Sequence, residues 1–133
     1  MYPFIRYAST IAHAALKAKK GDTLTFKDTS EIQFRCRLSD IDNFLEMNNG
    51  RVFTLYDLGR MDFAVRTGLG KQLLKQRWGL VIAGSTIQYR KRIRAFQKVT
   101  LKTKIVGILF LWNLNNFLFL RSSFAFQFIC GIE

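Results

Sequence analysis

The run over residues 31–38 constrains the fold most, because its side chains alternate strictly between polar and apolar. Side chains of a β-strand point alternately to its two faces, so this period predicts a half-buried strand with one face in a core. The apolar face would hold Ile32, Phe34, Cys36 and Leu38, and the polar face Glu31, Gln33, Arg35 and Arg37.

Two other stretches predict helices. Residues 49–67 follow the helical period, with Asn48 or Asn49 as the N-cap and Gly68 as the stop. The expected packing face of this long helix is Val52, Leu55, Tyr56, Gly59 and Phe63. Residues 7–20 are rich in Ala and Lys and end at Gly21, which predicts a short amphipathic helix with a basic last turn.

Two later segments predict strands. Residues 79–90 contain an apolar β-branched run that turns into alternation, and residues 97–106 alternate throughout, with Val99, Leu101 and Ile105 on one face. The order helix, strand, long helix, strand, strand suits an α+β fold in which a helix lies across an antiparallel sheet. With 133 residues and 49% hydrophobic side chains, the chain can bury one core of ordinary size, so a single domain over residues 1–133 is expected.

Residues 108–133 differ from the rest of the chain, because Arg121 and Glu133 are their only charged residues. A transmembrane helix needs about 20 mostly apolar residues. Four polar residues interrupt this stretch, so no span is expected: Asn113, Asn115, Asn116 and Arg121. The alternation of aromatic residues over 124–128 predicts a strand, and Asn115-Asn116 fits a turn between two more.

The net charge of +12 predicts attraction to polyanions, which include nucleic acid, an acidic membrane surface and phosphate-bearing small molecules. Charge alone does not choose among them. The basic end of the 7–20 helix fits peripheral membrane contact, although a solvated helix end explains it as well.

Cysteine and histidine usage bounds the chemistry. Cys36 and Cys130 lie far apart, and residues 1–10 lack the pattern of a signal peptide, so we expect a reduced, cytoplasmic protein. The cysteine spacing supports no zinc site, and His13 is the single histidine. Histidine triads, resident metals and cofactors are therefore not expected.

Acidic residues are concentrated in one part of this basic chain. Five of the nine fall within residues 40–62, which suggests a chemical role for this stretch: Asp40, Asp42, Glu46, Asp57 and Asp62. Of these, Asp57 and Asp62, together with Arg60, also fit surface ion pairs.

Six short motifs follow one another along the chain: FRCRLSDID at 34–42, MNNGR at 47–51, YDLGRMD at 56–62, RTGL at 66–69, STIQYRKR at 85–92 and FQKVTLKT at 96–103. In this order they resemble the thioesterase-like branch of the hotdog-fold acyl-CoA thioesterases, which include 4-hydroxybenzoyl-CoA thioesterase-like proteins. The resemblance implies an antiparallel sheet wrapped around one long helix, and a homodimer or tetramer with active sites at the subunit interface. It divides the domain into an N-terminal helical extension (1–30), a family-like core (31–107) and a divergent hydrophobic end (108–133).

The resemblance implies hydrolysis of an acyl thioester, with coenzyme A carried by the substrate rather than held as a cofactor. The second Asp of the Asp-x-Asp motif maps onto Asp42, as nucleophile or as general base toward water. Backbone N–H groups around Asn49 and Gly50, at the positive end of the long helix, fit donors to the oxyanion. Asp40 fits a structural role in the loop.

Glu46 is a departure, since many relatives carry His where this chain reads Glu46-Met47-Asn48-Asn49. Glu46 fits a base, a carboxylate that shares a proton with Asp42, or a solvated acid beside the helix dipole. Asn48 and Asn49 fit caps first and site-shaping residues second. Three further residues are assigned to substrate binding: Tyr56, which also fits simple packing, and Arg90 and Arg92, which fit phosphate contacts.

Two alternatives to the thioesterase remain open. One is a non-catalytic hotdog protein that binds acyl-CoA or a protein partner, and the other, less favoured, is a basic nucleic-acid binder using residues 90–94. Relatives continue after Val106-Gly107 with Trp-Asp and an acid-containing strand, whereas this chain does not. This departure suggests a shifted reading frame or a degenerate gene end after Gly107.

Overall fold

The computed structural model describes the backbone of residues 2–77, 79–82, 91–105, 111–114, 117–120 and 124–129, and the side chains of residues 4–77 and 91–105. The helices are α1 (Tyr2–Lys19), the 3-10 turn η1 (Leu38–Asp40), α2 (Asn49–Arg66) and α3 (Leu69–Gln76). The strands are β1 (Ser30–Arg35), β2 (Gly79–Ile82), β3 (Lys98–Ile105), β4 (Leu111–Leu114), β5 (Phe117–Leu120) and β6 (Phe124–Ile129).

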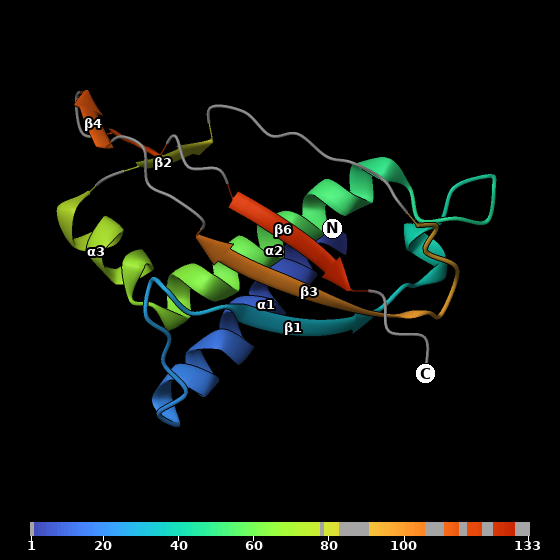
Figure 1. Cartoon of the computed structure of the whole chain (residues 1–133), viewed down its shortest axis with the longest axis horizontal. Coiled ribbons are helices and arrows are strands. Elements are labelled where there is room, and N and C mark those ends of the chain that lie inside the picture. Colours follow the sequence, from blue (N-terminus) through green and yellow to red (C-terminus); the bar gives the residue numbers. More distant parts are fainter. Residues whose placement is uncertain are drawn as a thin grey trace.

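One sheet has the order β1-β3-β6 and is antiparallel throughout (Figure 1). Its register places Ser30 opposite Thr103 and Ile105 opposite Phe124. The α+β class and the predicted strands at 31–38, 97–106 and 124–128 are confirmed in outline, and in β3 both Val99 and Leu101 are fully buried.

A second sheet has the order β2-β5-β4, and here β2 runs parallel to β5. This pairing departs from the purely antiparallel sheet expected. β2 and β5 are separated along the chain by β3 and β4, so no tight turn sets their relative direction. β4 and β5 do form the predicted antiparallel pair, while their turn at 115–116 and the rest of the 79–90 segment, from 83 onward, lie outside the described residues.

Helix α2 begins and ends where its caps predict. The Asn48 side chain accepts a hydrogen bond from the Gly50 N–H, and Gly68, at φ 79°, follows the last turn. Every residue of the expected packing face is buried: Val52, Leu55, Tyr56, Gly59 and Phe63. This face lies against β1 and β3 (Figure 1).

Gly59 allows α2 to approach β3 closely. A Cβ atom at this position would lie 2.5 Å from Thr103 Oγ1 and 2.7 Å from Leu101 Cδ2. Both distances are shorter than van der Waals contact, so either these side chains or the helix would have to shift to admit any larger residue.

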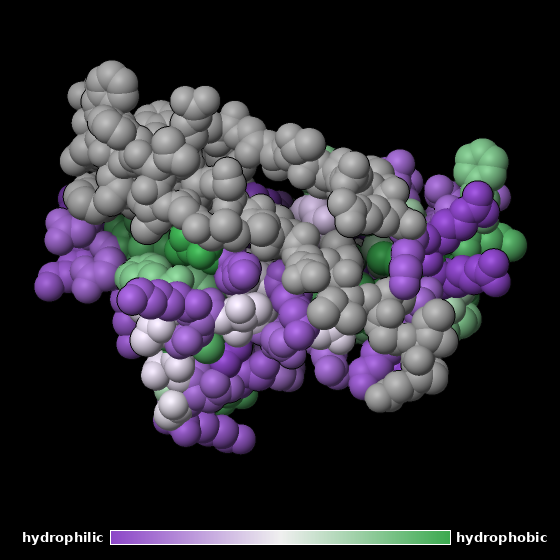
Figure 2. Space-filling model, viewed as in Figure 1, coloured by the Kyte–Doolittle hydropathy of each residue, from purple (hydrophilic) through white to green (hydrophobic). Residues whose placement is uncertain are grey.

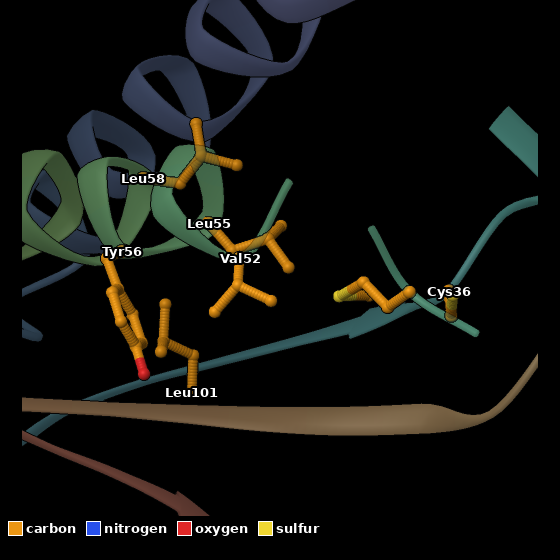
Figure 3. Close-up of a cluster of buried hydrophobic side chains, with 7 residues drawn as sticks. Cys36, Val52, Leu55, Tyr56, Leu58 and Leu101 are labelled. Atoms are coloured by element: carbon orange, nitrogen blue, oxygen red, sulfur yellow. The ribbon is translucent and has the colours of Figure 1, made fainter. Parts of the chain in front are cut away.

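Figure 3 shows the core cluster, in which Val52, Leu55 and Tyr56 of α2 lie near Leu101 of β3, while Cys36 lies apart from them just past the end of β1. Its buried members are Cys36, Met47, Val52, Leu55, Tyr56, Leu58 and Leu101. Burying each Leu or Val stabilises the fold by about 1.5–3 kcal/mol. The cluster therefore holds the N-terminal half of α2, which follows the loop after β1, against the sheet.

Two helices differ from expectation. α1 begins at Tyr2 rather than at residue 7, since Pro3 is tolerated in a first helical turn, and it packs on α2 with Ala14 fully buried. α3 was not expected. It spans only eight residues and contains Gly70, a poor helix former, so its sequence signal is weak.

Strand β1 is shorter than the alternating run. It ends at Arg35, and η1 follows, so Leu38 is 67% exposed instead of sharing the buried face with Cys36. The turn forms because the Arg37 N–H donates to Asp40 Oδ2 (3.0 Å) and the Asp40 N–H donates to the Arg37 carbonyl (2.9 Å). Local side-chain bonding has thus displaced the end of the strand.

Among the helices in the described part of the chain, none combines the length and the apolar character needed to cross a membrane.

Candidate functional site

The segment between η1 and α2 is a compact loop held by its own hydrogen bonds. Ile41 and Met47 form an antiparallel bridge, and the Asp42 N–H donates to the Glu46 carbonyl at 2.8 Å. Leu45, at φ 61°, makes the reversal. Phe44 and Leu45 are 83% and 76% exposed, and this apolar tip stands out among hydrophilic side chains on the right of Figure 2.

Asp42 is half-buried at the base of this loop. Its Oδ1 accepts hydrogen bonds from the Phe44 N–H (2.8 Å) and the Glu46 N–H (3.3 Å). Oδ2 has no hydrogen-bond partner within residues 4–77 and 91–105. One oxygen therefore holds the loop in shape and the other is left for a further contact.

Asp40 has the structural role expected of it, and it is fully buried. Besides the Arg37 N–H, its carboxylate contacts Arg6 Nη1 at 3.2 Å, and its carbonyl accepts the Asn48 N–H at 2.8 Å. Asp40 thereby connects the beginning of the loop, the N-cap of α2 and helix α1.

At the start of α2, oxygen atoms of Asn48 accept hydrogen bonds from several backbone N–H groups. Its side chain accepts the Gly50 N–H at 2.8 Å, and its carbonyl accepts the N–H groups of Arg51 (2.9 Å) and Val52 (3.3 Å). The cap role predicted for Asn48 is confirmed. The Gly50 N–H expected to meet an oxyanion is already bonded here, so that role stays a prediction and requires the Asn48 side chain to turn away.

A cavity of about 320 Å³ opens beside this loop. It is lined by Glu46, Met47, Asn49, Val52, Lys91, Arg92 and Ile93. The loop and the 91–94 segment are brought together by backbone pairing, because the Met47 N–H donates to the Ile93 carbonyl at 2.8 Å and Glu46 bridges to Arg94. The cavity combines apolar side chains with one carboxylate and two cations.

The Glu46 carboxylate is ion-paired at this cavity. Its Oε1 lies 2.9 Å from Arg92 Nη1, with the Glu46 side chain 30% exposed and that of Arg92 77% exposed. Glu46 is therefore neither a freely solvated acid nor directed at Asp42 in this arrangement.

The cavity gathers some of the predicted site residues and leaves others apart. Glu46, Asn49 and Arg92 line it, whereas Asp42, Asn48 and Gly50 belong to the adjoining loop and helix start without lining it. Arg90 lies outside the described residues.

Tyr56, predicted to contact substrate, is 7% exposed and belongs to the core cluster (Figure 3). It is not among the residues that line the cavity. Its structural role here is packing, which its position on the buried face of α2 already indicated.

Four lining residues were missed. Lys91 belongs to the basic run at 90–94, which gave a usable signal. Met47, Val52 and Ile93 could not be distinguished from ordinary core residues, because an apolar side chain beside a cavity has the same sequence pattern as one inside a core.

A second polar cluster lies on the opposite end of α2. The Ser30 hydroxyl donates to Asp62, Arg66 Nη1 lies 3.4 Å from the same Asp62 oxygen, and Arg66 Nη2 donates to Asp22 at 2.6 Å. Asp62 forms an ion pair across the helix with Arg66, as expected, but it is 1% exposed, so the predicted surface location of this pair was wrong. The ion pair between Asp57 and Arg60 is present as predicted.

The buried thiol of Cys36 is unsuited to nucleophilic attack. Burial, reinforced by the negative charge of Asp40 and opposed by Arg6, raises the pKa of Cys36 above its usual value. The thiol stays protonated near neutral pH, and only thiolates are strong nucleophiles. Within the described ranges no three His, Cys, Asp or Glu side chains are grouped so as to hold a metal ion.

The loop, the capped helix start and the adjoining cavity all lie at the beginning of α2. Comparison with known families is decisive about the class: a family described as the thioesterase-like superfamily matches residues 36–127, and the chain belongs to it. The match includes the loop, all of α2 and β3.

One curated relative is Protein THEM6 of Xenopus laevis, which is 28% identical over 103 residues. The aligned part is 77% of this chain and 48% of that protein, so the chain spans about half the length of the relative it matches. No solved structure matches.

Proposed function

We propose that this protein hydrolyses an acyl thioester, with acyl-CoA as the substrate, at the cavity beside the start of α2. Membership of the thioesterase-like superfamily supports the reaction class. The observation that carries the assignment of the site is the loop over residues 40–48, which joins Asp42, Glu46 and the capped helix start next to a cavity of about 320 Å³. In this proposal a hotdog sheet wraps around α2, and residues 1–133 form one domain with the three-part division given above.

The chemistry requires a carboxylate and a stabilised oxyanion. In one route a carboxylate of Asp42 or Glu46 takes a proton from water, and the hydroxide adds to the thioester carbonyl. The tetrahedral intermediate then collapses, and the C–S bond breaks to release the coenzyme A thiolate and a free acid. In the other route the Asp42 carboxylate attacks the carbonyl, expels the thiolate and forms a mixed anhydride that water hydrolyses.

The proposed roles follow from where the two carboxylates lie. Glu46 lines the cavity and would act nearest the substrate, while Asp42 accepts the Glu46 backbone N–H through Oδ1 and keeps its other carboxylate oxygen without a described partner. Lys91 and Arg92 at the same cavity supply positive charge for the phosphates of coenzyme A. A second subunit in a homodimer would complete the wall of this open site.

A non-catalytic acyl-CoA binder is the second candidate, and two observations favour it. Arg92 lies 2.9 Å from the Glu46 carboxylate and so occupies one of its oxygens, and Asn48 already uses the Gly50 N–H. Such a protein would keep the cavity and its cations while lacking turnover.

A thiol-release assay with acyl-CoA substrates of increasing chain length tests the proposal. Wild type should release thiol, and Asp42→Asn or Glu46→Gln should lower kcat by about a hundredfold or more, the usual contribution of a positioned base. The variant with the larger loss identifies the principal carboxylate.

The chain offers matched controls. Asp28→Asn alters another loop Asp that accepts hydrogen bonds from its own turn, and Glu31→Gln alters another ion-paired Glu, 2.6 Å from Lys102. Both should leave kcat unchanged. Binding of acyl-CoA without turnover in wild type would establish the second candidate, and absence of both would exclude both.

A further inference from the structure

Helix α1 presents an apolar face to solvent. It packs on α2 through Ala14, and its exposed side includes Phe4 (77% exposed), Ile5 (67%), Ile11 (41%) and Leu16 (55%). Ile5, Ala12 and Leu16 recur at seven and then four residues, so they form one stripe along the outward side. The C-terminal part of α1 projects past the edge of the β1-β3-β6 sheet in Figure 1.

The same helix is basic and has no acidic residue in its sequence. Its cations are Arg6, Lys17 and Lys19, and Lys20 follows directly. Arg6 is turned inward to Asp40, whereas Lys19 and Lys20 are exposed. Exposed aliphatic side chains next to exposed lysines fit a helix that lies in a membrane interface.

We propose that the outward face of α1, defined by Ile5, Ala12, Leu16, Lys19 and Lys20, docks on the surface of an anionic lipid bilayer. The apolar stripe enters the boundary between headgroups and acyl chains, and the two lysines contact lipid phosphates. This inference is independent of the thioesterase proposal, since the face is formed by α1 and the cavity by the 46–52 and 91–93 segments.

Charge complementarity selects this occupant over the two others that would fit. A second copy of the same face would bring together two helices of net positive charge, with no acidic residue of α1 to pair the lysines. Nucleic acid would use the lysines but would leave Ile5 and Leu16 in water. An anionic lipid surface engages both the apolar stripe and the lysines.

Co-sedimentation of the full chain with vesicles tests the proposal. The protein should bind vesicles of phosphatidylcholine containing about one-third phosphatidylserine, should bind pure phosphatidylcholine far less, and should be released by salt, because basic residues near an anionic surface are screened within a Debye length. Equal binding to both vesicles, or no binding to the anionic ones at low salt, would overturn it.

Matched variants locate the contact. Lys19→Glu with Lys20→Glu should weaken binding by at least about twentyfold, and Leu16→Ser by about tenfold. The controls change the same residue types on α3: Lys71→Glu with Lys75→Glu, and Leu74→Ser, where Leu74 is 81% exposed. Equal losses in the controls would show that only bulk charge or general hydrophobicity matters and would refute the assigned face.

A fluorescent probe tests the contact by a second measurement, which does not depend on the charge-changing variants staying folded. In a Cys130→Ser background, with the buried Cys36 retained, a polarity-sensitive dye on Ala12→Cys should shift to the blue with anionic vesicles, whereas the same dye on Gln76→Cys should not. A dye on Ala12→Cys that responds to protein concentration without lipid would assign the face to self-association instead.

Discussion

Arg6 of α1 and Asp40 of η1 form a buried ion pair, with Arg6 Nη1 3.2 Å from Asp40 Oδ2. The Asp40 side chain is fully inaccessible to solvent, and Arg6 also lies over the Phe34 ring at 5.8 Å from its centroid. Since Asp40 holds the N-cap of α2 through its carbonyl, this pair couples the N-terminal helix to the loop that carries the candidate site.

Removal of Arg6 should destabilise the protein strongly. Arg6→Ala leaves the buried Asp40 carboxylate without its cation, and the loss of one partner from a buried pair costs about 3–5 kcal/mol. Urea unfolding measures the change. Arg92→Ala, which breaks the exposed pair with Glu46, should cost no more than about 1 kcal/mol. Similar losses in the two variants would contradict the buried character of the Arg6 contact.

Gly59→Ala should lower the free energy of unfolding by about 1–3 kcal/mol, because the new methyl group overlaps Thr103 and Leu101. Gly70→Ala is the matched control. Its Cβ would meet nothing closer than the Ala64 carbonyl oxygen at 3.6 Å, so the better helix propensity of Ala should stabilise α3 by about 0.5–1 kcal/mol. Opposite signs are expected in thermal or urea unfolding, and the same sign for both would show that α2 is not held against β3 as described.

Ser30→Ala should also destabilise the fold, by about 1–3 kcal/mol. The substitution removes the hydroxyl that donates to the buried Asp62 carboxylate, and a buried polar group that loses a partner is costly. Ser9 is exposed and donates only to the Arg6 carbonyl one turn earlier, so Ser9→Ala should change stability by less than about 0.5 kcal/mol. Comparable effects at the two serines would indicate that the Asp62 cluster is accessible to water.

Stability should fall in alkaline solution as Cys36 of the unfolded chain ionises. Because burial raises the pKa of Cys36 in the folded state, the native protein keeps the thiol proton at pH values where the unfolded chain has lost it. The unfolded state then binds fewer protons, and the free energy of unfolding decreases as the pH rises above about 8.5, with full stability below it. In urea unfolding across this pH range, the free energy of unfolding should decline less steeply for Cys36→Ala than for wild type. An identical decline would show that a group other than Cys36 causes it.

The local elements of this fold were largely predictable. The period of two over residues 31–38 identified β1, and a cap at Asn48 or Asn49 with a stop at Gly68 gave both ends of α2 to within about a residue. The end of β1 could not be predicted, because Asp40 turns the backbone through hydrogen bonds to Arg37 that compete with the strand. α3 was missed since one short, glycine-containing helix has too few residues to show a period.

The candidate site was predictable only in part. A carboxylate loop before a helix start was visible in the order Asp42, Glu46, Asn48. The sequence did not show which of these groups faces the cavity, because that depends on the pairing of Met47 with Ile93 from a distant part of the chain. Asp62 was misplaced for the same reason: its partner Ser30 precedes it by a strand, a loop and most of a helix.

The order of residues alone determined where β1 and α2 form, since side-chain alternation and helix caps act between neighbours within a few positions. Tertiary structure alone decided that Glu46 meets Arg92 at a cavity, that Asp62 is buried, and that α1 joins the loop through Arg6 and Asp40. These contacts unite segments far apart in the chain, and the burial of α2 against the sheet brings them together.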